Sequence, residues 1–275
     1  MHKILILTSG NVSKLDGFSD LVDKGSFADI NFDSGSKDLK SSFAIRFKNN
    51  DLKTYKLIYF RMVGKSLEIA TLVVDYAKQN GIQIVDRMYE TAHLLPISLG
   101  KALEMRKLQE KGIPIPKTVF GSFDGIDFPY IVKSTTGQKS REVWLVNNLK
   151  ELELLRSKID NNKLYFIQEL IANARRIRVL VVGDKAIGAI ARQTKWNKDE
   201  TKETLKIIPE DIQKLALESA KTVDLDICGI DILVDSKTNE KYVIEANAAP
   251  AWKLINKYCG VIVEDEIIKY LSKQI

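Results

Sequence analysis

The sequence contains few of the residues on which the best-known catalytic reactions depend. Its 275 residues include only two histidines and two cysteines. With His2 and His93 alone, histidine-based acid–base chemistry and Ser-His nucleophiles are not expected. Cys228 and Cys259 lack the spacing of metal ligands, so we expect reduced thiols that pack as small hydrophobic groups in a cytoplasmic protein.

Long hydrophobic runs and long basic runs are also absent. The run from Ile4 to Leu7 is too short for a signal peptide or a membrane helix, so no membrane partner is expected. The net charge is +6, but no stretch of five basic residues and no nucleic-acid-binding signature occurs, which argues against a nucleic-acid partner. The positive balance suits a phosphorylated or acidic small molecule. With 45% hydrophobic residues, the chain can bury a large core.

The order of apolar segments predicts an α/β protein that begins with a small α/β domain over residues 1–95. Strands are expected over residues 3–8, 43–47, 56–62 and 82–86. A helix is expected over residues 67–80, where Asn80-Gly81 ends it. A strand–helix–strand series is typical of a parallel sheet. The pattern between residues 10 and 40 favours no element.

After Pro96 the pattern changes to longer helices and paired strands. Helices are expected over residues 98–111, 147–158, 209–223 and 261–272. Strands are expected over residues 128–134, 143–146 and 164–171. The dipeptide Gly183-Asp184 predicts a tight turn between two strands that span residues 175–192.

Two carboxylates fall within short Ile- and Val-rich strands near the C-terminus. Cys228–Val234 and Tyr242–Asn247 flank a polar loop and predict a hairpin in which Asp231 lies opposite Ile244 or Glu245. Like charges directly opposite each other destabilise a strand pair, unless a cation lies between them. Mg²⁺ prefers such hard oxygen ligands. The alternative is that both carboxylates are solvated and pair with lysines.

The segments Gly229-Ile-Asp-Ile-Leu and Glu245-Ala-Asn-Ala-Ala-Pro250 resemble the metal-binding signature of the ATP-grasp superfamily. The most similar branch is that of the RimK-like ligases, the ribosomal-protein glutamate ligase type. By this resemblance Asp231, Glu245 and Asn247 would be the ligands of Mg²⁺, with Mn²⁺ as the alternative ion.

The resemblance covers residues 96–273 and implies the ATP-grasp fold. In that fold two α+β subdomains, here residues 96–166 and 167–275, clasp ATP, and residues 1–95 form the preceding domain. The segment 111–118, together with Lys101, resembles a family pattern in which the lysine contacts an ATP phosphate, although Gly100 stands where the family has Asp. The alternative for Lys101 is a solvated helix lysine.

Two further segments resemble nucleotide-binding parts of the family. The lysine of Phe128–Ser134 matches a phosphate ligand, and burying an ammonium group at the end of an apolar strand is costly unless it is paired, so Lys133 is the second predicted phosphate ligand. The segment 164–171 resembles the strand that links the two subdomains and holds adenine. The resemblance therefore places Gln168, Glu169 and Leu170 at the nucleotide base. An ordinary strand with polar residues at its end is the alternative.

The predicted hairpin carries the arginines that would act in catalysis. By resemblance, Arg178 and Arg192 would neutralise the charge of the phosphates and of the acyl-phosphate. Arg176 stands where the family has Asp, which leaves ribose recognition open, and these arginines could instead form a solvent-exposed sheet face. The family's glycine-rich lid corresponds to residues 135–142, where only Gly137 remains, and a loop near Thr194–Asn197 lacks the family's arginine.

The resemblance implies an ATP-dependent carboxylate–amine ligase that forms an amide bond through an acyl-phosphate. Its partners would be ATP, a carboxylate-bearing substrate and an amine-bearing substrate, among them an acidic amino acid such as glutamate or a peptide, and relatives often form homo-oligomers. Two alternatives stay open: a non-catalytic nucleotide- or peptide-binding relative, and a basic nucleic-acid-binding protein. The sequence does not identify the acid or the amine.

Overall fold

The computed structural model describes residues 3–32, 45–64, 66–91, 101–134, 142–160, 165–193, 202–205 and 207–275. Its N-terminal part forms a parallel sheet with the strand order β2-β1-β6-β7. The strands are β1 (Ile4–Thr8), β2 (Asp23–Ser26), β6 (Leu57–Met62) and β7 (Gln83–Val85). Helix α1 (Leu67–Gln79) connects β6 to β7 and ends at Asn80, before Gly81 with its φ of 67°. The predicted parallel α/β unit is confirmed.

Several short elements accompany this sheet. They are the 3₁₀ helices η1 (Val12–Leu15), η2 (Phe27–Asp29) and η3 (Leu52–Thr54), the strands β3 (Ile30–Phe32), β4 (Ile45–Phe47) and β5 (Asn50–Asp51), and helix α2 (Met88–Thr91). Strands β3 to β5 pair in an antiparallel sheet of their own. Each element is too short to show a hydrophobic period, which is why the sequence gives little indication of most of them.

A second, antiparallel sheet has the order β10-β9-β11-β8. Its strands are β8 (Thr118–Phe120), β9 (Tyr130–Ser134), β10 (Val143–Val146) and β11 (Tyr165–Glu169). Helix α3 (Lys101–Glu110) precedes it, and helix α4 (Leu149–Arg156) packs on it with Leu152 and Leu155 buried. This sheet and α4 share a hydrophobic core of their own.

The largest sheet is antiparallel and has the order β14-β13-β12-β15-β16. Its strands are β12 (Ala174–Val182), β13 (Lys185–Gln193), β14 (Lys202–Thr204), β15 (Ile227–Asp235) and β16 (Lys241–Asn247). Helix α5 (Glu210–Thr222) covers one face, and α6 (Lys253–Cys259) and α7 (Val263–Ser272) follow β16. Gly183, with a φ of 60°, makes the predicted turn between β12 and β13.

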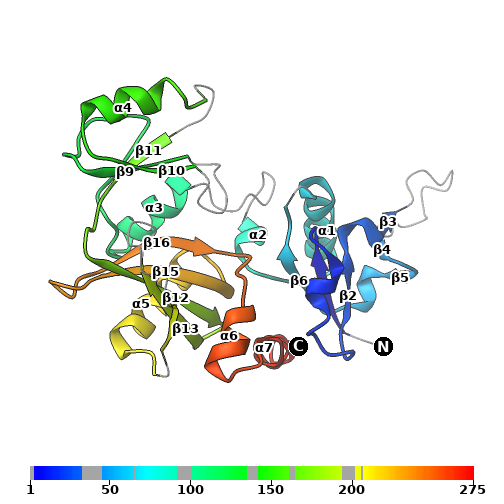
Figure 1. Cartoon of the computed structure of the whole chain (residues 1–275). Helices are drawn as coiled ribbons and strands as arrows, with labels where there is room; N and C mark the ends of the chain where they lie inside the picture. The colour runs from blue at the N-terminus through cyan, green and yellow to red at the C-terminus, as the bar shows by residue number, and fades with distance from the viewer. Residues whose placement is uncertain are drawn as a thin grey trace.

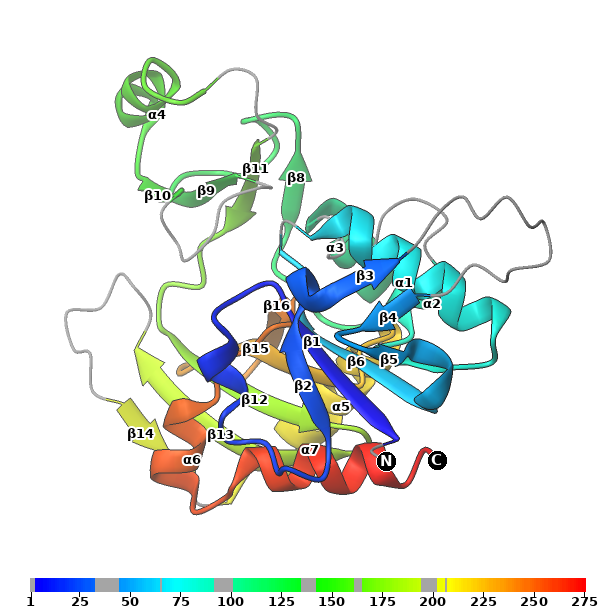
Figure 2. The same ribbon diagram turned by 90° about the vertical axis from the view of Figure 1, so that its right-hand side faces the viewer.

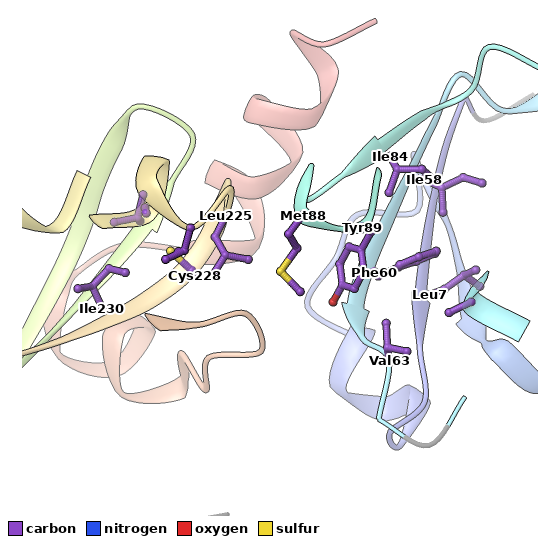
Figure 3. Close-up of a cluster of buried hydrophobic side chains, with 14 of the residues drawn as sticks. Leu7, Ile58, Phe60, Val63, Ile84, Met88, Tyr89, Leu225, Cys228 and Ile230 are labelled. Carbon is purple, nitrogen blue, oxygen red and sulfur yellow. The ribbon is translucent and has the colours of Figure 1, made fainter. Parts of the chain in front are cut away.

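Figures 1 and 2 show the sheet of β8 to β11 above the sheet of β12 to β16, with the N-terminal strands beside the latter. Residues of the N-terminal sheet and of the large sheet belong to one continuous buried cluster. In Figure 3 Met88 lies between Leu225 and Cys228 on one side and Tyr89 and Phe60 on the other. The N-terminal unit is therefore docked directly on the large sheet.

Asp86 adds a polar contact to this junction. Its Oδ1 accepts hydrogen bonds from the backbone N–H groups of Asp226, at 2.7 Å, and Ile227, at 2.8 Å, where β15 begins. The side chain is fully buried, and its Oδ2 has no partner among the described residues. Burial raises the pKa of Asp86 to about 8, against the opposing effect of the two backbone donors.

Helix α6 and strands β8 and β14 were not predicted. The helix buries Ile255, while Leu254 and Tyr258 are exposed, so it lacks a continuous apolar stripe. No described helix has the length and apolar character that crossing a bilayer requires. The predicted boundaries between residues 1–95, 96–166 and 167–275 stay predictions. Pro96 and the proposed helix cap Ser98 lie outside the described residues.

The pH dependence of stability tests the buried carboxyl of Asp86. In the unfolded chain its pKa returns to about 4, so the folded state binds the extra proton and loses stability as the pH rises from there toward 8. Asp86→Asn keeps an acceptor for both amides but cannot ionise. In urea unfolding, the stability of the wild type relative to this variant should fall between about pH 5 and about pH 8. A constant difference over that range would contradict the assignment.

Candidate active site

The pairing of β15 with β16 places the two predicted carboxylates next to each other. Asp231 lies directly opposite Glu245, which confirms one of the two predicted registers. A bulge between Asp231 and Ile232 leaves Ile244 as the extra residue of β16. Asn247 lies opposite Gly229, which precedes Asp231 by two residues in β15. Asp231 is fully buried, so the sheet has to supply its counter-charge.

Two arginines of β12 supply that charge. Arg178 lies opposite Asp231 in the ladder and donates from Nε to Oδ1 and from Nη2 to Oδ2, both at 2.7 Å. Arg176, two residues earlier on the same strand face, donates from Nη2 to Oδ2 of the same carboxylate. Burial would raise the pKa of Asp231, but these two guanidinium groups hold it well below its usual range. Asp231 therefore stays ionised.

Helix α3 brings a second charged group to the edge of β16. Lys101 donates from Nζ to Glu245 Oε1 at 2.8 Å and lies 3.6 Å from Glu104 Oε2. Glu104 is buried and its Oε1 accepts the backbone N–H of Ala246 at 2.6 Å. Burial raises the pKa of Glu104 to about 7, although Lys101 opposes the shift. Burial disfavours the charged form of Lys101, but both carboxylates keep its pKa raised.

The third part of the site comes from the sheet of β8 to β11. Lys133 of β9 donates from Nζ to Gln168 Oε1 at 2.6 Å, and Gln168 donates from Nε2 to Thr118 Oγ1 at 3.0 Å. Burial lowers the pKa of Lys133 to about 8, and the positive charges of Lys101 and Arg176 add to this effect. Because these charges act on Lys133, the lysines of α3 and β9 and the arginines of β12 lie close to one another.

The remaining predicted residues occupy less constrained positions. Glu169 ends β11 on the surface, and its backbone N–H donates to Lys117 O at 2.9 Å. Leu170 follows it and is half-buried. Their contact with adenine stays a prediction. The backbone of Arg192 lies opposite Arg176, but its side chain lies outside the described residues, as do most of the predicted lid and the Thr194–Asn197 loop.

A divalent metal fits the donor set in chemical type. Asp231, Glu245 and Asn247 offer carboxylate and amide oxygens, which Mg²⁺ prefers. Glu245 Oε2 has no hydrogen-bond partner among the described residues, whereas Asn247 Oδ1 accepts the N–H of Ala249 at 2.9 Å. No group of three or more His, Cys, Asp or Glu side chains suited to a metal occurs in the described part of the chain. An ion here therefore needs the amide oxygen of Asn247 and oxygens from a bound substrate.

Sequence reasoning did not identify three residues of this site as participants. Arg176 was noted only as a departure from the family pattern. Glu104 carries a detectable signal, since it follows Lys101 by three residues on a helix and so faces the same side. Thr118 carries no such signal, because its contact with Gln168 depends on the pairing of β8 with β11.

Comparison with known proteins agrees with the resemblance seen in the sequence. A family model described as a RimK-like ATP-grasp domain matches residues 103–271, more than half of the chain. Among curated proteins, a probable alpha-L-glutamate ligase 2 of Pseudoalteromonas atlantica is 28% identical over 249 residues, which cover 84% of this chain and 80% of that protein.

Solved structures with low sequence identity share the fold. One is the ATP-grasp ligase PsnB with its precursor peptide PsnA2 and AMPPNP, with a TM-score of 0.71, 16% identity and 98% coverage of both chains. Another is D-alanine–D-alanine ligase of Bacillus anthracis with ATP, with a TM-score of 0.63, 15% identity, and coverage of 99% of this chain and 98% of that one. The predicted fold class is confirmed.

Removing the charge of Asp231 should destabilise the protein. Asp231→Asn leaves two partly buried guanidinium groups without their carboxylate. Removing one partner of a buried ion pair lowers the free energy of unfolding by about 3–5 kcal/mol. Glu245→Gln is the matched control, because its side chain is 35% exposed and should change stability little. Urea unfolding measures both. Equal stability of Asp231→Asn and the wild type would show that the pairing does not support the sheet.

The pKa of Lys133 predicts how nucleotide binding depends on pH. An ammonium group attracts phosphate and the neutral amine does not, so ADP affinity should fall as the pH rises through about 8. Lys133→Met should bind ADP more weakly at neutral pH and show a flatter profile, whereas Lys133→Arg should bind without this pH dependence. Calorimetric titration from pH 7 to about pH 9 measures the effect. If ADP affinity depended on pH in the same way in the wild type and in Lys133→Met, Lys133 would not be a phosphate ligand.

Proposed function

The chain belongs to the RimK-like ATP-grasp family, and we propose that its cluster of cations around Asp231 and Glu245 is the site where it uses ATP to join a carboxylate to an amine. The observation that supports this proposal most is that Lys101 and Lys133, from two separate elements, lie near the pair of Glu245 and Asp231, which Arg178 contacts from a third. Such a set of fixed positive charges suits the phosphates of a nucleotide.

The reaction divides into two displacements, and the chain contributes mainly position and charge. A substrate carboxylate oxygen attacks the γ-phosphorus of ATP, and the bond from that phosphorus to ADP breaks. The amine of the second substrate then attacks the acyl carbon, inorganic phosphate leaves, and the amine loses a proton to solvent. Lys101 and Lys133 hold the phosphates, while Arg178 and Arg192 offset charge on the transferred phosphoryl group.

The nucleotide and its metal ion are assigned to neighbouring residues. Asp231, Glu245 and Asn247 would hold Mg²⁺, which when bound supplies additional positive charge to the phosphates. The end of β11, with Glu169 and Leu170, would lie at the adenine. Gln168 is buried and hydrogen-bonded to Lys133, so we assign it the role of orienting this lysine.

The proteins compared above suggest the substrate class. One relative carries the name of an alpha-L-glutamate ligase, and one structural neighbour was solved with a precursor peptide. We therefore assign an acidic amino acid as one substrate and an amino acid or peptide as the other.

A non-catalytic nucleotide-binding relative is the second candidate. The contact of Arg176 with Asp231 favours it, because that contact occupies a carboxylate oxygen that a metal would need. Substrate-dependent release of phosphate from ATP separates the two candidates.

A substrate screen tests the proposed activity. The chain is incubated with ATP, Mg²⁺, and pairs of amino acids or short peptides, and products are read by intact mass and by phosphate release. The expected result is an amide product, formed in equal amounts with ADP, from pairs that contain an acidic amino acid. Nucleotide binding without any phosphate release across the screen would favour the non-catalytic candidate.

Glu245→Gln tests the role of the site directly. The substitution keeps the shape of the side chain but removes the charge that would face the metal. We expect ATP turnover to fall by roughly 10²–10³-fold, in line with the loss of one preorganised electrostatic contact. Thermal unfolding should change little, because the side chain is partly exposed and Glu104 remains beside Lys101. Full activity at low Mg²⁺ would contradict the assignment of Glu245.

A further inference from the structure

Arg176 holds a carboxylate that the proposed metal site needs. Asp231 accepts one hydrogen bond at Oδ1, from Arg178, and two at Oδ2, from Arg178 and Arg176. An ionised carboxylate has about four lone-pair positions, so three of them are already occupied. A metal ion that approaches Asp231 has to replace a guanidinium hydrogen bond. Arg178 is held by two bonds and Arg176 by one, so Arg176 is the weaker attachment.

The balance of charge also works against a metal ion that arrives alone. Among the described residues, the cations of the site are Lys101, Lys133, Arg176 and Arg178, whereas its carboxylates are Asp231, Glu245 and Glu104. A free divalent cation therefore meets an excess of positive charge. The negative charges of a nucleotide's phosphates reverse this balance, because they pair with the same cations.

Arg176 has an unused donor that suits a phosphate. Its Nε is buried and has no hydrogen-bond partner among the described residues, and a buried unpaired donor is costly. A guanidinium group binds phosphate oxygens most favourably through two parallel N–H groups. Turning from Asp231 toward a phosphate would let Arg176 use Nε together with Nη2. The exchange therefore improves the hydrogen bonding of Arg176 and releases Asp231 Oδ2.

We propose that Arg176 makes metal binding at Asp231 conditional on bound nucleotide. Without nucleotide, Arg176 holds Asp231 Oδ2 and keeps divalent cations out. When the phosphates of ADP or ATP bind, Arg176 transfers its hydrogen bond to a phosphate oxygen and leaves Asp231 Oδ2 to the metal. This inference rests on the proposed nucleotide site. Because coupling between two ligands is reciprocal, metal must strengthen nucleotide binding by the same factor as nucleotide strengthens metal binding.

Binding of Mn²⁺ by the full chain, followed by the paramagnetic resonance signal of the free ion and corrected for the Mn²⁺ that ADP binds in a protein-free sample, tests this coupling without any turnover. The wild type should bind Mn²⁺ weakly alone and more tightly with ADP. Arg176→Gln removes the competing cation, so without ADP this variant should bind Mn²⁺ on the order of tenfold more tightly than the wild type. The increase in Mn²⁺ affinity that ADP causes should be smaller in this variant than in the wild type. Arg176→Lys keeps the positive charge but lacks the two parallel N–H donors of a guanidinium group, and it should still exclude Mn²⁺ when ADP is absent.

Arg175→Gln is the matched control. Arg175 neighbours Arg176 on β12, but alternate residues of a strand point to opposite faces, so this variant should resemble the wild type. The bidentate pair of Arg178 with Asp231 remains in every variant and supports the fold, which thermal unfolding verifies.

The outcomes separate this inference from the proposed function. If the wild type and Arg176→Gln have the same Mn²⁺ affinity without ADP, and ADP raises that affinity by the same factor in both, Arg176 does not control metal binding. The proposed nucleotide site would not be affected by that result. If no variant binds ADP, or if ADP never promotes Mn²⁺ binding, the proposed site itself is wrong and the inference fails with it.

Discussion

A fully buried carboxylate, Asp231, determines how the charged groups of this protein are arranged. An ionised group in the middle of a sheet needs strong counter-charges, and Arg176 and Arg178 supply them from the neighbouring strand. Those arginines, with Lys101 and Lys133, leave the region with more positive than negative side chains. In the proposed function, the same groups that stabilise Asp231 attract the phosphates of the nucleotide. On this proposal, structural support and ligand binding depend on one set of contacts.

The fold places these groups by bringing three separate parts of the chain together. The large sheet provides Asp231, Glu245 and the arginines, helix α3 provides Lys101, and β9 of the upper sheet provides Lys133. The upper sheet has its own hydrophobic core, whereas the N-terminal sheet shares a core with the large sheet. The charged cluster thus draws on a small unit with a separate core and on a larger continuous body, and the proposed nucleotide would bind between them.

Local patterns were enough to predict the elements with a clear period. The inner stripe of α5, from Ile212 to Val223, is buried as the helical spacing predicts. The polar loop between β15 and β16 predicted a hairpin in which Asp231 lies opposite Ile244 or Glu245, and it lies opposite Glu245. The contacts of Arg176 and Thr118 could not be predicted in this way. They depend on which strands become neighbours, and a sequence window contains no information on that pairing. Helix α6 was not predicted because apolar residues lie on its exposed side as well as its buried side, so the segment shows no amphipathic period.

The most direct test of the account is an experimental structure of the chain with ADP and Mn²⁺, in which anomalous scattering locates the ion. The account predicts an ion bound to oxygens of Asp231, Glu245 and Asn247, phosphates within hydrogen-bond distance of Lys101 and Lys133, and Arg176 turned from Asp231 toward a phosphate. An ion or a nucleotide bound elsewhere, with the contacts between Asp231 and both arginines unchanged, would contradict it.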